Sequence, residues 1–141
     1  MFSQSTIKPK GFTLIEILVT ISIIGLLTMV GITNFRVASQ KARDGRRQGD
    51  LEQIKAALEL YRTDEGEYPG SITPGATIES AAGTVYMNVV PDDPLSGQDY
   101  YYSSGTDTYT LCAALELDTS GSCAGSCGTG VTCNYQITSP L

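Results

Sequence analysis

The sequence has no histidine and no tryptophan, and only 17% of its 141 residues are charged. Without histidine the chain cannot build a Ser-His-Asp or Cys-His nucleophile system, and most catalytic zinc sites are excluded as well. Basic residues are also missing after Arg62. The nine basic residues up to Arg62 accompany five acidic ones, a net charge of +4, whereas residues 63–141 carry ten acidic residues, a net charge of −10. A uniform enzyme domain of this length is not expected to divide its charge in this way.

A long run almost without charge stands near the N-terminus. In the 22 residues 12–33, Glu16 is the only charge, and about 20 apolar residues suffice to span a bilayer. Lys8 and Lys10 precede the run without an acidic residue, which places the N-terminus in the cytoplasm and residues 34–141 outside. A cleaved secretory signal is the alternative, but it would have a shorter apolar core followed by a small-residue cleavage site. We therefore expect a retained single-pass membrane helix.

Glu16 is unusual in this run, because a carboxylate inside a bilayer needs a partner or a proton. One interpretation is a snorkelling or protonated carboxyl group without a role. The other is that Glu16 meets a cation supplied by another copy of the chain. The sequence offers one candidate for this cation, the new α-amine that a cut immediately before Phe12 would create.

The segment Gly11-Phe12-Thr13-Leu14-Ile15-Glu16 resembles the cleavage and methylation site of type IV pilins and type II secretion pseudopilins. The shared features are a short basic leader ending in glycine, a phenylalanine, an acid at the fifth mature residue and a long apolar helix. The resemblance implies that a prepilin peptidase cuts between Gly11 and Phe12 and methylates the Phe12 amine. It also implies that Glu16 of one subunit pairs with the Phe12 amine of a neighbour during filament assembly.

A proline near the end of the apolar run, which many relatives carry, is missing, and Gly31-Ile32-Thr33 stands there instead. A proline-linked unwinding of the helix is therefore not implied, although Gly25 and Gly31 could loosen the helix or let helices pack closely. Because no proline occurs between the apolar run and Tyr68, we expect one helix that continues through Arg62.

The second half of this helix is expected to be amphipathic. Its apolar residues recur at helical spacing and form a stripe able to cover a sheet: Leu51, Ile54, Leu58 and Tyr61. The spacing also predicts two i,i+4 ion pairs, Arg46–Asp50 and Lys55–Glu59.

Four basic residues cluster ahead of the stripe, namely Lys41, Arg43, Arg46 and Arg47. A nucleic-acid patch is one interpretation, but a head of charge −10 repels phosphate backbones. We interpret the cluster as a solvated stretch outside the bilayer that meets acidic residues of adjacent subunits. The sequence from Lys41 to Pro69 resembles the second half of the long helix in the G-type, or major, pseudopilins.

The acidic segment after the helix has the composition of turns and short strands. Residues 99–104 and 108–116 flank Gly105-Thr106-Asp107, which favours a hairpin, and residues 131–138 are a plausible third strand. Residues 85–90 form a further short apolar run. Three strands laid across the helical stripe would form a core. The tyrosines of this segment are expected to form the face and rim of the sheet, a ligand-stacking platform being the alternative.

The four cysteines Cys112, Cys123, Cys127 and Cys133 all lie in this head, on the side placed outside the cytoplasm, where disulfides persist. Three pairings are possible. We favour Cys112–Cys133, joining two strands, with Cys123–Cys127 closing the loop. A zinc site with four cysteine ligands is the rival, but the spacings do not form the paired knuckles of structural zinc sites.

Resemblance to the G-type pseudopilins also implies a calcium ion held by acids in the C-terminal loop. Calcium takes six to eight oxygens, usually from several carboxylates. Asp118 is the last acidic residue of this chain, and cysteines occupy the loop. We therefore expect no cofactor and no metal, with disulfides in place of the ion.

These observations predict an α+β chain in four segments: a leader (residues 1–11), a membrane and assembly helix (12–33), its amphipathic continuation (34–62) and an acidic extracytoplasmic head (63–141). The resemblance implies a structural subunit of a type IV pilus-like or type II secretion filament, periplasmic or extracellular, and not an enzyme. The implied partners are further copies of the chain, prepilin peptidase, an assembly platform in the inner membrane and minor pilins. Nucleic acid is not expected among them.

Several alternatives stay open at this point. The resemblance over Lys41–Pro69 favours a secretion pseudopilin, whereas a cysteine-stapled loop favours a pilus subunit. A monomeric, membrane-tethered binding module is a second class of function. An enzyme is a third class, and it would need a carboxylate pair chosen from Asp92, Asp93, Asp99 and Asp107.

Overall fold

The computed structural model describes residues 11–105, 107–118 and 120–139, so residues 1–10 of the expected leader lie outside the described residues. One long helix, α1 (Leu14–Glu65), is followed by five short strands. The chain divides into two compact units, of which the first ends at Ala38 and the second is Ser39–Leu141. The α+β class predicted from the sequence is confirmed.

Helix α1 begins and ends with local signals. At its start, the backbone N–H of Glu16 donates to Oγ1 of Thr13 (3.3 Å), while a carboxylate oxygen of Glu16 accepts from the Thr13 backbone N–H (2.8 Å). This reciprocal arrangement is a capping box. At the other end Gly66 has a φ of +84°, and its N–H donates to the carbonyl of Arg62, which is the left-handed ending that glycine allows. The helix runs unbroken through Gly25 and Gly31.

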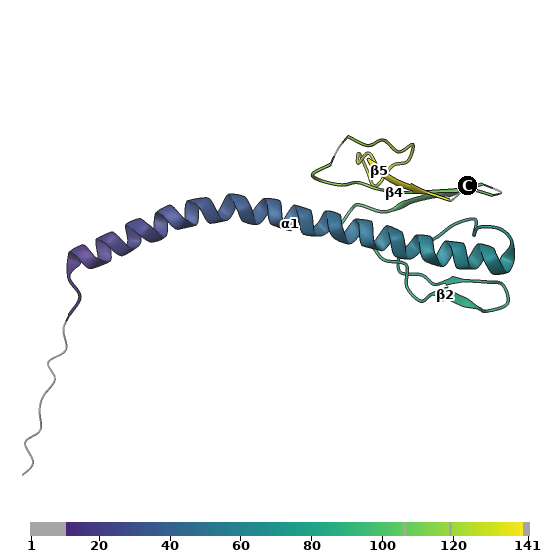
Figure 1. The fold of residues 1–141 in the computed structure, drawn as a ribbon, viewed down its shortest axis with the longest axis horizontal. Coiled ribbons are helices and arrows are strands. Elements are labelled where there is room, and N and C mark those ends of the chain that lie inside the picture. Colours follow the sequence, from purple (N-terminus) through teal and green to yellow (C-terminus); the bar gives the residue numbers. More distant parts are fainter. Residues whose placement is uncertain (1–10, 106, 119, 140–141) are drawn as a thin grey trace, which may run out of the picture. The chain divides into compact units, whose positions relative to one another are not determined.

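The second unit contains two antiparallel sheets. Strands β1 (Ile78–Glu79) and β2 (Val85–Met87) form a two-stranded sheet. Strands β3 (Tyr101–Ser104), β4 (Tyr109–Ala113) and β5 (Tyr135–Thr138) form a three-stranded sheet in the order β3-β4-β5. In Figure 1 the second half of α1 has the three-stranded sheet on one side and the β1–β2 pair on the other. The three predicted strands are confirmed, but each is shorter than expected, and β1 was not predicted.

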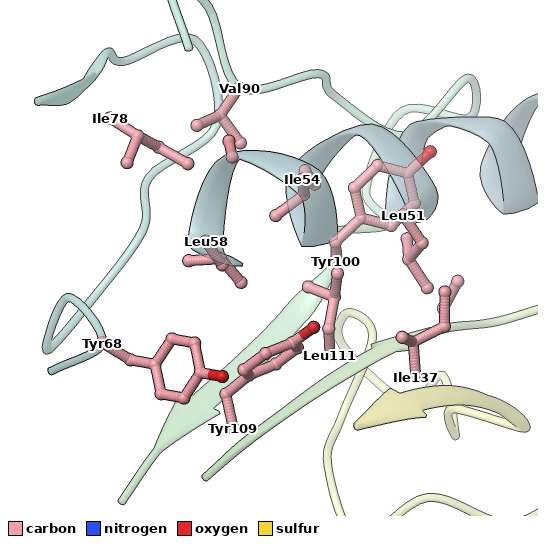
Figure 2. Packing of buried hydrophobic residues seen from close by; sticks show 12 residues of the cluster. Leu51, Ile54, Leu58, Tyr68, Ile78, Val90, Tyr100, Tyr109, Leu111 and Ile137 are labelled. Atoms are coloured by element: carbon pink, nitrogen blue, oxygen red, sulfur yellow. The ribbon is translucent and has the colours of Figure 1, made fainter. Parts of the chain in front are cut away.

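The core of the second unit lies where the helical stripe meets both sheets. Leu51, Ile54 and Leu58 are fully buried, and Figure 2 shows them beside side chains that come from both sheets, such as Ile78 and Leu111. The other members of this cluster are Ala57, Tyr68, Ile78, Val90, Tyr100, Tyr109, Leu111, Ala113 and Ile137. Tyr61, the last residue of the predicted stripe, is partly buried against it. The expected packing of the stripe on the sheet is confirmed.

A second, smaller core lies on the β4 side of the head. It consists of Cys112, Ala114, Cys123, Cys127 and Cys133, with Tyr101 and Val131 packed against it. Two buried clusters therefore stabilise the second unit: one between α1 and the sheets, and one around the cysteines.

Candidate functional site

The first candidate site is the start of α1, where an acidic side chain stands among exposed apolar ones. Phe12 is 84% exposed and Ile15 is 68% exposed. Glu16, Val19 and Thr20 complete the lining of a shallow hollow together with these two residues. Within the described part of the chain the Glu16 carboxylate has hydrogen bonds only to Thr13.

The apolar surface continues along the first unit. Exposed large apolar side chains recur from the first turn of α1 to Val37, and α1 has a window that is long and apolar enough to cross a membrane. An apolar surface of this extent in a protein marks contact with a membrane or with other proteins. Sequence reasoning located Phe12 and Glu16 but missed Thr13, although the Thr-x-x-Glu spacing of a capping box was present as a signal.

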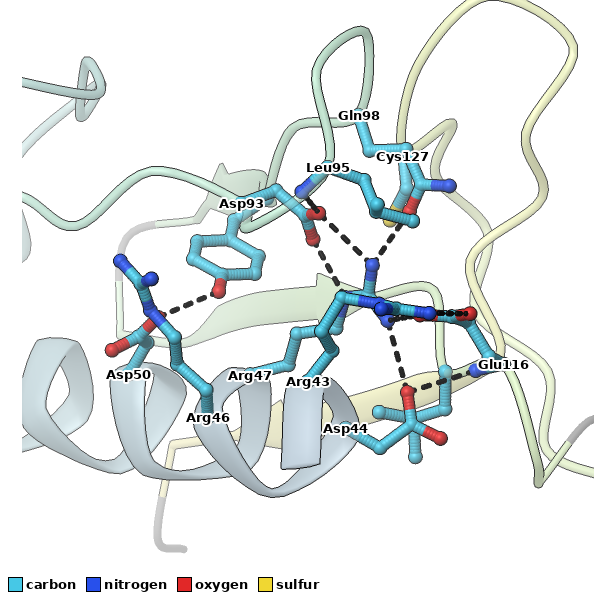
Figure 3. Close-up of polar contacts among 12 residues, drawn as sticks. Arg43, Asp44, Arg46, Arg47, Asp50, Asp93, Leu95, Gln98, Glu116 and Cys127 are labelled. Atoms are coloured by element: carbon cyan, nitrogen blue, oxygen red, sulfur yellow. Dashed lines mark hydrogen bonds and ion pairs between the residues drawn. The ribbon is translucent and has the colours of Figure 1, made fainter. Parts of the chain in front are cut away.

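The second candidate site is an ionic cluster that joins α1 to the head (Figure 3). Arg47 is completely buried. Its Nε and Nη2 donate to the two carboxylate oxygens of Asp93 (2.8 and 3.0 Å), and its Nη1 donates to Asp44 (2.9 Å) and Glu116 (3.1 Å). Nη2 also donates to the side-chain oxygen of Gln98 (3.2 Å). A buried charge is tolerated when it is paired in this way. We call this group of residues the Arg47 cluster.

The carboxylates of the Arg47 cluster also bind the backbone. Asp44 accepts the N–H groups of Glu116 (2.9 Å) and Leu117 (3.0 Å), so the helix holds the chain just after β4. Arg43 donates to both oxygens of Glu116 (2.6 and 2.7 Å). These hydrogen bonds from Arg43, and next those from Arg47, lower the pKa of Glu116 to about 2. The hydrogen bonds to Asp93 raise the pKa of Arg47 above its ordinary value.

The interpretation of the four basic residues is wrong for two of them. Arg43 and Arg47 bind acids of their own chain, so they are not a solvated stretch that waits for adjacent subunits. Lys41 is exposed, and the side chain of Arg46 is 60% exposed and lies 3.6 Å from Asp50, as the i,i+4 spacing predicted. No sequence signal could have identified the pairs of Arg43 and Arg47 with Asp93 and Glu116, because these partners lie 46 to 73 residues apart.

Of the two predicted i,i+4 ion pairs, Arg46–Asp50 is confirmed and Lys55–Glu59 is wrong. Lys55 pairs with Glu52 at 3.5 Å rather than with Glu59. Glu59 instead accepts a hydrogen bond from the hydroxyl of Tyr68 (3.2 Å), a residue of the core that the spacing of charges could not reveal.

Two of the four carboxylates considered for an enzyme lie beside arginines of the same chain. Asp93 binds Arg47, and Asp107 lies 3.3 Å from Arg62. Several tyrosine hydroxyls also have partners within the chain. The Tyr100 hydroxyl donates to Asp50 (2.8 Å), and burial raises the pKa of Tyr100. Tyr102 donates to the Pro69 carbonyl (2.7 Å). These contacts agree with tyrosines that form the face and rim of the sheet.

The expected disulfide pairing is wrong, because the structure joins Cys112 to Cys123 and Cys127 to Cys133. The register of the sheet explains the difference. Gln136 of β5 lies opposite Cys112, so Cys133, three residues earlier, is not the cross-strand partner of Cys112. A tight turn instead brings Cys133 beside Cys127, whose N–H donates to the Val131 carbonyl (3.0 Å). All four cysteines are therefore in disulfides in this structure.

Two family models match the sequence. The prokaryotic N-terminal methylation motif matches residues 8–32, and the model of type II secretion system protein G matches residues 34–122. The second match ends before three of the four cysteines.

Curated relatives give the same result. The type II secretion system core protein G of Escherichia coli K12 is 32% identical over 107 residues, which is 69% of this chain and 73% of the relative. The core protein G of Pseudomonas aeruginosa is 31% identical over 121 residues, covering 75% and 84%. That of Pectobacterium carotovorum is 30% identical over 111 residues, covering 70% and 69%. No solved structure matches the chain significantly.

Proposed function

Because the chain belongs to the family of type II secretion system protein G, we propose that it is the structural subunit of a secretion filament that polymerises through the first part of α1. In this proposal a prepilin peptidase cuts between Gly11 and Phe12 and methylates the Phe12 amine. The matched methylation motif supports this step. Between the two filament types left open by the sequence, family membership favours the pseudopilin.

The position of Glu16 carries the proposal. Its carboxylate stands on an apolar helix surface, four residues after the proposed cut, and its hydrogen bonds within the described residues go to Thr13 alone. Packing such helices together would remove the carboxylate from water, which is costly without a counter-charge. The freed Phe12 amine of a neighbouring copy supplies that charge. The pair would therefore favour one register between neighbouring helices.

The proposal includes a topology and a set of partners. Lys8 and Lys10 keep the N-terminus in the cytoplasm, and the head lies outside the inner membrane until it enters a periplasmic filament. The partners are other copies of the chain, prepilin peptidase, an inner-membrane assembly platform and minor pseudopilins. The role is assembly rather than catalysis, and it requires no cofactor.

Substitution of Glu16 tests the proposal and separates two roles of the carboxylate. Glu16→Ala removes both the charge and the capping box, whereas Glu16→Gln keeps the capping hydrogen bonds and removes only the charge. Either variant leaves the Phe12 amine of the neighbouring copy without a counter-charge, and an unpaired charge inside a membrane costs about 2.5–3.5 kcal/mol. We therefore expect both variants to reduce the amount of polymer, measured by chemical cross-linking, by roughly tenfold or more. Glu67→Gln, an exposed acid in the head, is the matched control and should assemble normally.

Membrane fractions from the cells that produce these variants also report on processing of the leader. Mass spectrometry should find a chain that starts at methylated Phe12. A start at Met1 or beyond Thr33 would contradict the proposal. Normal assembly of Glu16→Gln together with failure of Glu16→Ala would reduce the role of Glu16 to helix capping. Normal behaviour of both variants would favour the monomeric tethered binding module.

A further inference from the structure

We propose that the disulfides Cys112–Cys123 and Cys127–Cys133 replace the calcium ion implied by the family, so that this head requires thiol oxidation and no metal. The segment concerned, residues 114–134, is called the cystine loop below. The inference goes beyond the filament role, and it is tested by the unfolding of the head within the full chain, so assembly does not enter the result.

The oxygen donors of the cystine loop do not fit calcium. The ion takes six to eight oxygens, usually including several carboxylates, and this loop has only Glu116 and Asp118. Both oxygens of Glu116 accept hydrogen bonds from Arg43. One oxygen of Asp118 accepts from the N–H (3.1 Å) and the hydroxyl (2.6 Å) of Ser120. Among the described residues, no group of three histidine, cysteine, aspartate or glutamate side chains could hold a metal ion.

The disulfides form a buried core where an ion would otherwise be needed. Cys112, Cys127 and Cys133 are fully buried, and Cys123 is 7% exposed. Tyr101 and Val131 pack against them. A loop with few apolar residues gains little from hydrophobic burial, so a cross-link that limits its unfolded conformations is an effective substitute.

Two glycines let the cystine loop lie directly on the rest of the head. A Cβ atom at Gly121 would stand 1.8 Å from the carbonyl oxygen of Asn134, and one at Gly125 would stand 2.2 Å from the ring of Tyr101. Backbone therefore packs against backbone and against an aromatic ring at these two positions. In this proposal the disulfides hold the loop in this close contact.

The cystine loop is also connected to the Arg47 cluster. The side chain of Asn134, next to Cys133, accepts from the N–H of Leu115 (2.6 Å) and donates to its carbonyl (2.8 Å). The next two residues, Glu116 and Leu117, donate their N–H groups to Asp44 of the helix. Oxidation of the cysteines should therefore order the segment through which the head is held on α1.

The covalent step is a thiol–disulfide exchange that requires an oxidising disulfide from the extracytoplasmic compartment. For each bond, two cysteine thiols lose two protons and two electrons and become one S–S bond. The oxidising disulfide takes up these electrons and protons and leaves as two thiols. Two such reactions complete the head.

The test measures how the disulfides and how calcium change the thermal unfolding midpoint of the full chain in detergent. All eight tyrosines lie at or after Tyr61, so near-ultraviolet circular dichroism follows the head. For the wild type we expect the same unfolding midpoint, within about 2 °C, in calcium and in a chelator. The paired variants Cys112→Ser with Cys123→Ser and Cys127→Ser with Cys133→Ser should each lose about 8 °C or more, with no rescue by calcium. Asp118→Asn, the matched control, should unfold like the wild type.

Hydrogen exchange locates the effect. In a paired variant that still folds, the amides of Glu116 and Leu117 should lose protection, while those of the β3–β4 ladder keep it. A paired variant that is unfolded both with and without calcium would also support the inference. A midpoint that calcium raises by 5 °C or more, in the wild type or in a paired variant, would overturn it. Unchanged protection at Glu116 and Leu117 in a folded variant would overturn it as well.

Discussion

Arg47 shows how a single residue can organise this head. A guanidinium group presents five N–H donors in a plane, and in this protein those donors reach three carboxylates and an amide. The carboxylates come from the helix, from the segment before β3 and from the segment after β4. One side chain of α1 therefore gathers three separate parts of the chain.

The first prediction concerns the removal of this side chain. Arg47→Ala leaves Asp93, whose side chain is 1% exposed, buried without its counter-charge. Loss of one partner from a buried ion pair costs about 3–5 kcal/mol of unfolding free energy. Urea unfolding of the full chain, followed by the tyrosine circular dichroism of the head, measures this loss.

The neighbouring Arg46→Ala provides the control. The side chain of Arg46 is 60% exposed and lies 3.6 Å from Asp50, so this i,i+4 pair is expected to contribute no more than about 0.5 kcal/mol. Arg47→Lys should fall between the two variants, because an ammonium group cannot form the paired hydrogen bonds to Asp93. Equal stability of Arg46→Ala and Arg47→Ala would show that the Arg47 cluster is not held together by charge.

At the scale of elements, glycine has opposite effects on stability in α1 and in the cystine loop. Gly49 lies on the exposed face of α1, and a Cβ atom there would meet nothing within 4 Å. Gly121 faces the carbonyl of Asn134 at a distance that excludes any side chain. A glycine in a helix therefore weakens the element, whereas a glycine in the loop permits its close packing.

The second prediction compares alanine at these two positions. Gly49→Ala should raise the unfolding free energy of the head by about 0.5–1 kcal/mol, because alanine is the better helix former. Gly121→Ala should lower it by about 1–3 kcal/mol, because the added methyl group overpacks the loop. The same tyrosine signal in urea compares both variants with the wild type. A loop that accepts alanine without loss would contradict the close packing described for Gly121.

At the scale of the whole molecule, the chain combines an apolar first unit with a self-contained second unit, which contains the head and the second half of α1. The buried core, the Arg47 cluster and both disulfides lie within Ser39–Leu141. Removal of the leader with Lys8 and Lys10 would change the net charge from −6 to −8. A net negative charge favours solubility of the second unit. The apolar first unit instead needs contact with a membrane or with other copies of the chain.

The third prediction follows from this division. A fragment of residues 39–141 should fold in solution and unfold cooperatively with heat. A fragment of residues 63–141 should not fold, because it lacks Leu51, Ile54 and Leu58 as well as Arg47. Circular dichroism and hydrogen exchange of the two fragments measure the difference. Cooperative unfolding of the shorter fragment would show that α1 is not part of the core of the head.

Local sequence patterns determined the elements of this protein and its family. The apolar run, the absence of proline and the stripe from Leu51 to Tyr61 were sufficient to predict α1 and the face that it buries. The Gly11–Glu16 segment identified the pilin-like N-terminus. These features depend on neighbours a few residues apart, which a sequence displays directly.

Only the tertiary structure decided which distant groups meet. Arg47 could have paired with many of the fifteen acids, and the β4–β5 register placed Gln136 rather than Cys133 opposite Cys112. Strand β1 has two residues and exists because β2 pairs with it. The free energy of each such contact depends on burial and on orientation, and both arise only when the chain has folded.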